Sequence, residues 1–206
     1  MEHLLRVKSE AECLLEMAKG LEVLPLSVIE GAGFSRSVVT RLVRDGRLDR
    51  ISRGLYRRPD APVSEHHDLV EVVARANKAV VVLLSALRFH ELGTQQPNSV
   101  WIQLPARAGV PKMEWPTLRV VRTRIEALFT EGVDRHLIGG MEVPITNPAR
   151  TVVDCFKYRN QVGLEVCLEA LKELIRRDRN VMDPLYRYAK INRVQKVMQP
   201  YLEAAV

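Results

Sequence analysis

The sequence predicts an α+β protein of two domains, on three observations. Helix-like spacing of apolar residues over 9–44 gives way to strand-like alternation over 47–58. A Pro-Asp-Ala-Pro stretch at 59–62 has the composition of a hinge. Beyond it, helical patterns enclose several strand-like segments, which favours a small and mainly antiparallel sheet. We therefore expect an N-terminal domain over residues 1–60 and a C-terminal α+β domain over residues 61–206.

Two short helices are expected at the start of the chain. Ser9 with Glu12 three residues on is a capping-box pattern, which predicts a helix over residues 9–19. Pro25 suits a first helical turn, so a second helix is expected over residues 25–30.

The third expected helix, residues 36–44, is strongly amphipathic. Ser35 is its candidate N-cap, and Gly46 is its stop. At about 100° per residue, arginines and hydroxyls fall on one face and branched aliphatic side chains on the other. The polar face is Arg36, Ser37, Thr40, Arg41 and Arg44, and the apolar face is Val38, Val39, Leu42 and Val43.

The period then changes to that of strands. Residues 47–52 and 54–58 alternate apolar side chains with arginines, and Gly54 interrupts them, which predicts a basic hairpin. Three helices followed by such a hairpin are the element order of a winged helix-turn-helix. In that fold the third helix enters the DNA major groove and the hairpin lies beside the backbone.

The whole formal charge of the chain lies within residues 33–58. That stretch holds eight arginines and two aspartates, and the excess of six equals the +6 of the full sequence. Local basic charge over such a pattern is typical of a nucleic-acid-binding surface. The stretch has no lysine, and the planar guanidinium of arginine suits both guanine edges and phosphates. A solvated helix with scattered arginines is the alternative.

Position divides the candidate DNA-binding residues into two groups. Side chains on the outer face of the third helix are base-edge candidates, and those at its N-terminus and along the hairpin are phosphate candidates. The base-edge candidates are Ser37, Thr40, Arg41 and Arg44, and the phosphate candidates are Arg36, Arg47, Arg50, Arg53 and Arg57.

The C-terminal domain is expected to alternate helices and strands. Asn147 and Pro148 are the cap and first residue of one helix, in which Arg150 and Asp154 are spaced to pair. The other expected elements are helices over 65–76, 83–92, 163–177 and 184–206, strands over 99–105 and 117–123, and a hairpin over 135–146.

Several function classes lack support in the sequence. The longest apolar run, residues 79–87, is too short for a bilayer, which needs roughly 20 residues. The N-terminus lacks a signal peptide's apolar centre, so a cytoplasmic protein is expected. Cys13, Cys155 and Cys167 are expected to be buried thiols. Metal spacing, phosphate loops and hydrolase motifs are missing, so we expect no metal, cofactor or catalytic residues, and no enzyme.

One histidine and a second set of arginines could have either a structural or a functional role. His90 near a helix end is expected to be structural. Arg119, Arg122 and Arg124 form a second basic set on an expected strand, and they either mark an exposed sheet edge or touch DNA flanks or RNA.

Two separated motifs resemble those of the AbiEi-type antitoxins, which are transcriptional repressors of type IV toxin–antitoxin and phage-defence operons. Residues 53–57, Arg-Gly-Leu-Tyr-Arg, resemble the end of that family's wing. Residues 145–156, ITNPARTVVDCF, resemble its (S/N)PxRTxxD helix, here Asn147, Pro148, Arg150, Thr151 and Asp154.

The resemblance implies that the N-terminal domain binds double-stranded operator DNA and represses its own operon. It implies antitoxin activity in the C-terminal domain, directed at a nucleotidyltransferase-like toxin without need of a stable complex. Paired half-sites would be read by self-association or cooperative binding. The alternatives are a stand-alone winged-helix regulator and a DNA-targeted nuclease.

Overall fold

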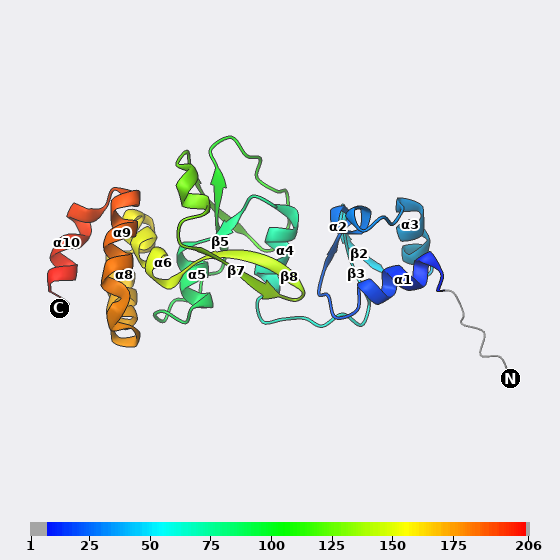
Figure 1. The fold of residues 1–206 in the computed structure, drawn as a ribbon, viewed down its shortest axis with the longest axis horizontal. Coiled ribbons are helices and arrows are strands. Elements are labelled where there is room, and N and C mark those ends of the chain that lie inside the picture. The colour runs from blue at the N-terminus through cyan, green and yellow to red at the C-terminus, as the bar shows by residue number, and fades with distance from the viewer. Residues whose placement is uncertain (1–7, 205–206) are drawn as a thin grey trace. The chain divides into compact units, whose positions relative to one another are not determined.

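A computed structural model describes residues 8–204, which divide into two compact units (Figure 1). The first unit contains residues 8–75 and 137–142, and the second contains the rest. The protein is α+β, as predicted. The predicted domain boundary after residue 60 stays a prediction, because packing shows which residues lie together and not which segments act independently.

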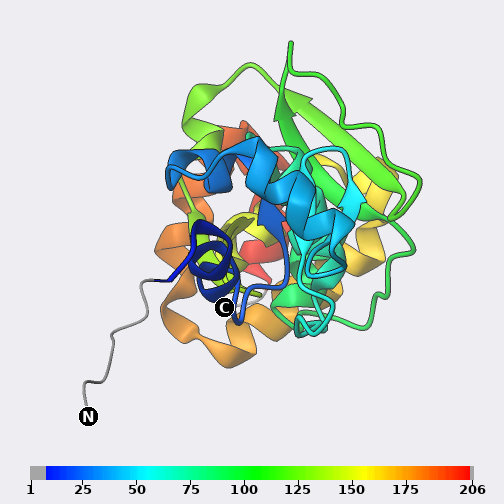
Figure 2. The ribbon, with the colours of Figure 1, turned by 90° about the vertical axis from the view of Figure 1, so that its right-hand side faces the viewer.

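The first unit combines short helices with a three-stranded antiparallel sheet of order β1-β3-β2. Figure 2 shows it from a second direction, with α1 in dark blue. Its elements are α1 (Glu10–Met17), β1 (Leu24–Pro25), α2 (Leu26–Gly31), α3 (Arg36–Arg44), β2 (Asp49–Ser52), β3 (Leu55–Arg57) and α4 (His67–Arg75). The sequence pattern does not predict β1, because a strand of two residues has no periodicity.

The N-terminal signals of α1 and α3 behave differently. The Glu12 N–H donates to the Ser9 hydroxyl at 3.3 Å, and the Ser9 N–H donates to the Glu12 carboxylate at 2.8 Å, so the capping box is confirmed. Ser35 occupies the predicted N-cap position of α3 but makes no side-chain cap. Its hydroxyl lies 2.9 Å from the Ser37 hydroxyl, so the two short side chains satisfy each other instead.

The apolar face of α3 fixes the helix in the core of the first unit. Val38, Val39 and Leu42 are buried and pack in one cluster with Leu14 and Ile29. Complete burial of a Leu, Ile or Val side chain stabilises a fold by roughly 1.5–3 kcal/mol. The face that carries the arginines is thereby held outward.

The second unit contains most of a five-stranded sheet of order β6-β5-β4-β8-β7, whose hairpin tip at residues 137–142 is counted with the first unit. Helix α5 lies between β4 and β5 in the sequence, and the other helices of this unit follow the sheet. The strands are β4 (Val80–Val81), β5 (Val100–Pro105), β6 (Leu118–Thr123), β7 (Val133–Ile138) and β8 (Met141–Thr146). The helices are α5 (Leu83–Phe89), α6 (Pro148–Lys157), α7 (Arg159–Val162), α8 (Leu164–Arg177), α9 (Met182–Asn192) and α10 (Gln195–Glu203), with short 3₁₀ turns η1 (Glu126–Phe129) and η2 (Arg179–Val181).

This larger sheet is mixed, which corrects the expectation of mainly antiparallel pairing. β5 pairs with β6 and β4 pairs with β8 in parallel, whereas β4 and β5 are antiparallel. The segment 106–117 carries the chain back along the sheet, so β6 starts at the same end as β5. Alternation in the sequence predicts where strands lie, but it does not predict whether two paired strands run parallel or antiparallel.

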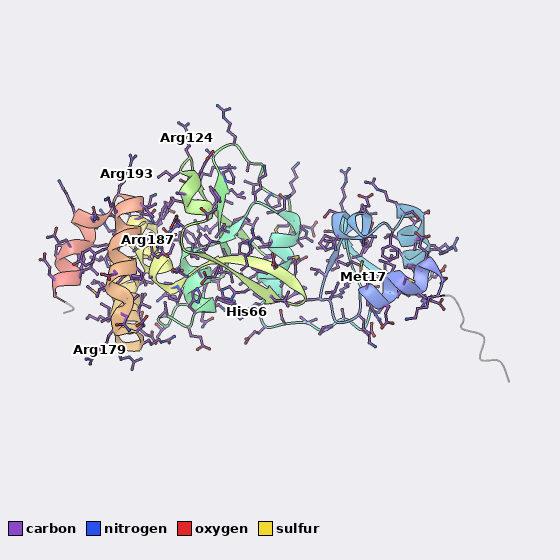
Figure 3. All side chains as sticks on the ribbon, in the orientation of Figure 1. Met17, His66, Arg124, Arg179, Arg187 and Arg193 are labelled. Carbon is purple, nitrogen blue, oxygen red and sulfur yellow. The ribbon has the colours of Figure 1, made fainter. Side chains whose placement is uncertain are left out.

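The last predicted helix is also corrected. One helix was expected over residues 184–206, but the structure has α9 and α10, separated at Arg193 and Val194. Arg193, labelled in Figure 3, adopts a left-handed conformation with φ of 59°. Such a residue ends a helix in the way that glycine does, and no glycine marked this turn in the sequence.

The three cysteines differ in exposure. Cys155 and Cys167 are buried, as predicted, but Cys13 is exposed on α1. Burial raises the pKa of Cys167 to about 11 and that of Cys155 well above its ordinary value. The thiolate is the reactive form, so Cys155 and Cys167 are shielded from reagents both by burial and by a raised pKa that keeps them protonated.

We therefore expect a single fast alkylation per native chain. At pH 8 iodoacetamide should modify Cys13 and leave Cys155 and Cys167 unmodified on the same timescale, as intact mass and peptide mapping would show. A Cys13→Ser chain is the control and should take up no label before unfolding. Fast labelling at two or more positions would contradict the assignment.

Candidate nucleic-acid interface

Helix α3 has the predicted bounds and displays its polar face to solvent. Arg36 to Arg44 is the helical range in both the prediction and the structure. All five residues of the polar face are exposed, namely Arg36, Ser37, Thr40, Arg41 and Arg44. Gly46 takes the positive φ of 66° that lets the chain leave the helix abruptly.

The predicted basic hairpin follows directly as β2 and β3. Arg50 pairs across the strands with Tyr56, and Gly54 turns the chain with φ of 74°. Arg50 and Arg53 are exposed, whereas Arg57 is half-buried. The structure thus brings α3 and a basic antiparallel hairpin together in one unit.

Acidic neighbours hold four of the eight arginines. The Arg36 guanidinium binds Glu30 at 2.5 Å, and this hydrogen bond raises the pKa of Arg36 and lowers that of Glu30. The other pairs are Arg44 with Asp45 at 3.2 Å, Arg57 with Asp49 at 4.0 Å and Arg58 with Asp60 at 2.8 Å. Each of these arginines must break its ion pair, or keep it while binding a second anion, in order to contact a phosphate.

The other four arginines are exposed and have no side-chain hydrogen bond or ion pair to any residue within 8–204. We refer to Arg41, Arg47, Arg50 and Arg53 as the unpaired arginines. Two hydroxyls of the α3 face are locally satisfied, since Thr40 donates to the Arg36 carbonyl at 3.0 Å and Ser37 contacts Ser35. A hydroxyl can exchange such a local bond for another partner at little cost.

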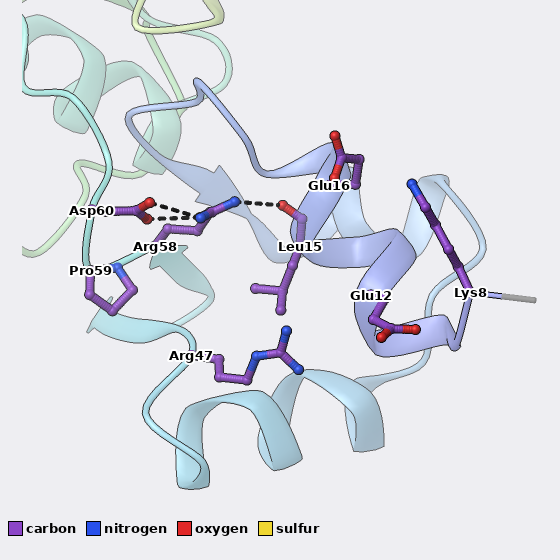
Figure 4. Close-up of a pocket in the computed structure, with 8 residues that line it drawn as sticks. All are labelled: Lys8, Glu12, Leu15, Glu16, Arg47, Arg58, Pro59 and Asp60. Carbon is purple, nitrogen blue, oxygen red and sulfur yellow. Dashed lines mark hydrogen bonds and ion pairs between the residues drawn. The ribbon is translucent and has the colours of Figure 1, made fainter. Parts of the chain in front are cut away.

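Arg47 lines a hollow of about 660 Å³ in the first unit (Figure 4). Arg58 also lines it and donates both to Asp60 and to the Leu15 carbonyl, the latter at 3.2 Å. The charged lining is balanced, with the cations Lys8, Arg47 and Arg58 and the acids Glu12, Glu16 and Asp60. This hollow therefore has no preference for an anion.

The ion pair with Glu30 makes a prediction about Arg36. Glu30→Gln should free the guanidinium for a phosphate, so we expect the plot of log Kd for DNA against log salt to steepen by about 0.9, the contribution of one added phosphate contact. Fluorescence anisotropy at several salt concentrations would measure it. Glu114→Gln is the matched control, because it removes an exposed acid of the second unit that holds no arginine. Equal slopes in the two variants would contradict the role of the pair.

In the second unit, the motif at residues 147–154 forms a buried polar network. Asn147 accepts from the Arg150 N–H at 2.9 Å, which confirms it as the cap of α6. The Arg150 and Asp154 side chains are buried and meet at 2.9 Å, as their spacing predicted. Arg150 also donates to the Glu131 carbonyl at 2.7 Å, and Asn192 donates to Asp154 at 2.8 Å.

The partners Glu131 and Asn192 were missed, since a residue 38 positions from Asp154 carries no local signal. The Arg150, Asp154 and Asn192 side chains are buried, and their contacts fix α6 to α9, so the network serves the fold of this unit. His90 is structural as well, because its Nε2 lies 2.7 Å from the Thr146 carbonyl oxygen and burial lowers its pKa.

The second basic set lies on and directly after β6, an edge strand of the larger sheet. Arg119, Arg122 and Arg124 are all exposed, and Figure 3 labels Arg124. Arg119 lies over the Trp101 ring at 5.9 Å from its centre, and Arg122 donates to three backbone carbonyls within 105–108. These contacts explain two of the three arginines structurally, and a role on DNA or RNA stays a prediction.

Within residues 8–204, histidines, cysteines and acids form no group that could hold a metal ion. The same part of the chain has no helix long and apolar enough to cross a membrane.

Fold and surface together define the class of protein: an α+β chain with an exposed arginine-bearing helix and a basic antiparallel hairpin, a surface typical of nucleic-acid recognition. Residues 27–59 match the family described as "Transcriptional regulator, AbiEi antitoxin". The resemblance inferred from the sequence is thereby confirmed for the segment that contains α3, β2 and β3.

One solved structure similar to this chain is described as the crystal structure of RV2827C protein from Mycobacterium tuberculosis. The likeness has a TM-score of 0.54 at 16% identity and covers 88% of this chain and 72% of that one. At this identity it concerns the fold alone. No curated protein matches the sequence.

Proposed function

We propose that this protein is a DNA-binding transcriptional repressor that acts as the antitoxin of a type IV toxin–antitoxin operon for phage defence and represses its own promoter. The observation that carries the proposal is the set of three unpaired arginines, Arg41 on α3 and Arg50 and Arg53 in the following hairpin, inside the segment that matches the antitoxin family. We propose further that the protein is cytoplasmic and has no catalytic activity.

The element order supports a winged helix-turn-helix as the DNA-binding unit. α2, α3, β2 and β3 follow one another in the order in which such folds place a positioning helix, a recognition helix and a wing. Arg41 on the outer face of α3 suits a guanine edge in the major groove. Arg50 and Arg53 on the hairpin suit phosphates beside it.

A gel shift with the promoter upstream of its own gene tests the DNA-binding part of the proposal. We expect a shift at physiological salt that weakens steeply as salt rises, because counterions return to the phosphates. A scrambled duplex of the same length and composition is the control and should bind more weakly by ~10³-fold or more. Equal binding to both duplexes, or no shift at all, would refute sequence-specific repression.

The antitoxin part is tested separately, by co-expression with a neighbouring nucleotidyltransferase-like protein and a growth assay. We expect growth arrest by the toxin to be relieved by the full chain, without a stable complex on size exclusion. A full chain with Arg41→Ala and Arg50→Ala should still relieve the arrest, which would separate the two activities. If the wild-type chain gives no relief, the stand-alone regulator is the better description.

A further inference from the structure

A pocket among the C-terminal helices of the second unit has no part in the proposed function. Its volume is about 770 Å³, and small-molecule sites in proteins occupy ~300–1,000 Å³. Helices α8, α9 and α10 and the short turn η2 all contribute to its wall.

The floor of this pocket is apolar. Leu168 and Ile175 lie two turns apart on one face of α8, Met182 begins α9, and Tyr201 comes from α10. Each of the four is half-buried, packing on one side against the hydrophobic core of the unit. The remaining apolar surface of these side chains lines the pocket.

The rim is cationic. Lys172, Arg176 and Arg179 line the pocket and are exposed, and no acidic residue of the described chain lines it. Arg176 forms an ion pair with Glu173 at 3.6 Å, but Lys172 and Arg179 have no ion pair with any residue in 8–204. Figure 3 shows Arg179 at one end of the helices. The helix dipole favours cations in the last turn of α8, but Lys172 lies before that turn.

We propose that this pocket binds a small amphiphilic anion, an organic acid whose apolar body lies on the floor and whose acid group meets Lys172 and Arg179. A rim of one charge sign over an apolar floor is complementary to such a ligand. A partner helix would need an apolar groove that continues along the surface. Tyr186 of α9 is a large exposed apolar side chain close in sequence to Met182, but it does not line the pocket, so it does not extend the apolar floor into such a groove.

The fluorescent probe 1-anilinonaphthalene-8-sulfonate, an aromatic body with one sulfonate, tests the site on the full chain. We expect saturable binding of one probe per chain, with displacement by decanoate and not by decyltrimethylammonium. Lys172→Glu and Arg179→Glu should each raise the probe's Kd by about tenfold, the loss of one charge-assisted contact. Both side chains are exposed, so neither change threatens the fold.

Lys196→Glu is the matched control, since it reverses one exposed charge on α10 outside the pocket. It should bind the probe as the wild type does. Non-saturable binding, equal displacement by the cationic competitor, or equal loss of affinity in Lys196→Glu would each overturn the proposal. These outcomes are independent of DNA binding, so they leave the repressor proposal untouched.

Discussion

Arg150→Met is expected to lower the free energy of unfolding by about 3–5 kcal/mol, the usual cost of removing one partner from a buried ion pair. The Arg150 side chain is fully buried. Its replacement removes the cation that pairs with the buried Asp154 carboxylate, which then keeps only the Asn192 amide as a donor, and it takes the Arg150 donor from the Glu131 carbonyl. Chemical denaturation followed by circular dichroism would measure the loss.

The loss should depend on pH in a defined direction. Burial is the largest influence on Asp154 and raises its pKa above the ordinary 3.8, and the Arg150 charge opposes that rise. Without Arg150 the folded-state pKa rises further, so the folded protein holds its proton more tightly than the unfolded chain does. The free energy of unfolding of the variant should then fall as pH rises from the unfolded-chain pKa of Asp154 through its raised folded-state pKa. The loss of stability relative to the wild type should therefore be smaller at pH 5 than at pH 8.

Two further variants isolate the ion pair. Arg150→Met with Asp154→Leu removes both charges, so it should be less destabilised than Arg150→Met alone. Arg124→Met removes an exposed arginine of the same unit and should change stability by less than about 0.5 kcal/mol. If Arg150→Met cost no more than Arg124→Met, the network would not hold this unit together.

The N-terminal unit was largely predictable because its signals are local. The Gly46 stop and a clean amphipathic face predict the bounds of α3 to the residue, and Val38, Val39 and Leu42 are buried as their spacing requires. The pairing of the arginines was not predictable in the same way. Glu30 precedes Arg36 by six residues across a turn, so only the folded chain shows that they meet.

The second unit was predictable in its elements and not in their assembly. β5, β6 and the β7–β8 hairpin lie where alternation placed them, but the parallel pairing of β5 with β6 depends on a connection without regular structure. The Arg150–Asp154 pair follows from helical spacing, whereas Asn192 reaches it from another helix. Long-range polar contacts leave no periodic trace in a sequence.

Arg41→Ala is expected to weaken binding to the operator by about 1–3 kcal/mol, or roughly 5- to 150-fold in Kd. Arg41 lies on the exposed face of α3, and no carboxylate within residues 8–204 competes for it. A base-edge contact discriminates between sequences, so the loss should fall mainly on the operator and little on a scrambled duplex. Anisotropy titrations with both duplexes at one salt concentration would measure the difference.

Arg50→Ala is the informative comparison, because Arg50 is also exposed but lies on the hairpin. As a phosphate contact it should weaken binding to both duplexes alike and reduce the salt slope by about 0.9. Lys196 lies on α10, far from the hairpin in the sequence, so Lys196→Ala should leave both titrations unchanged. If Arg41→Ala weakened both duplexes equally with a reduced salt slope, α3 would hold the DNA backbone, and sequence recognition would have to come from another element.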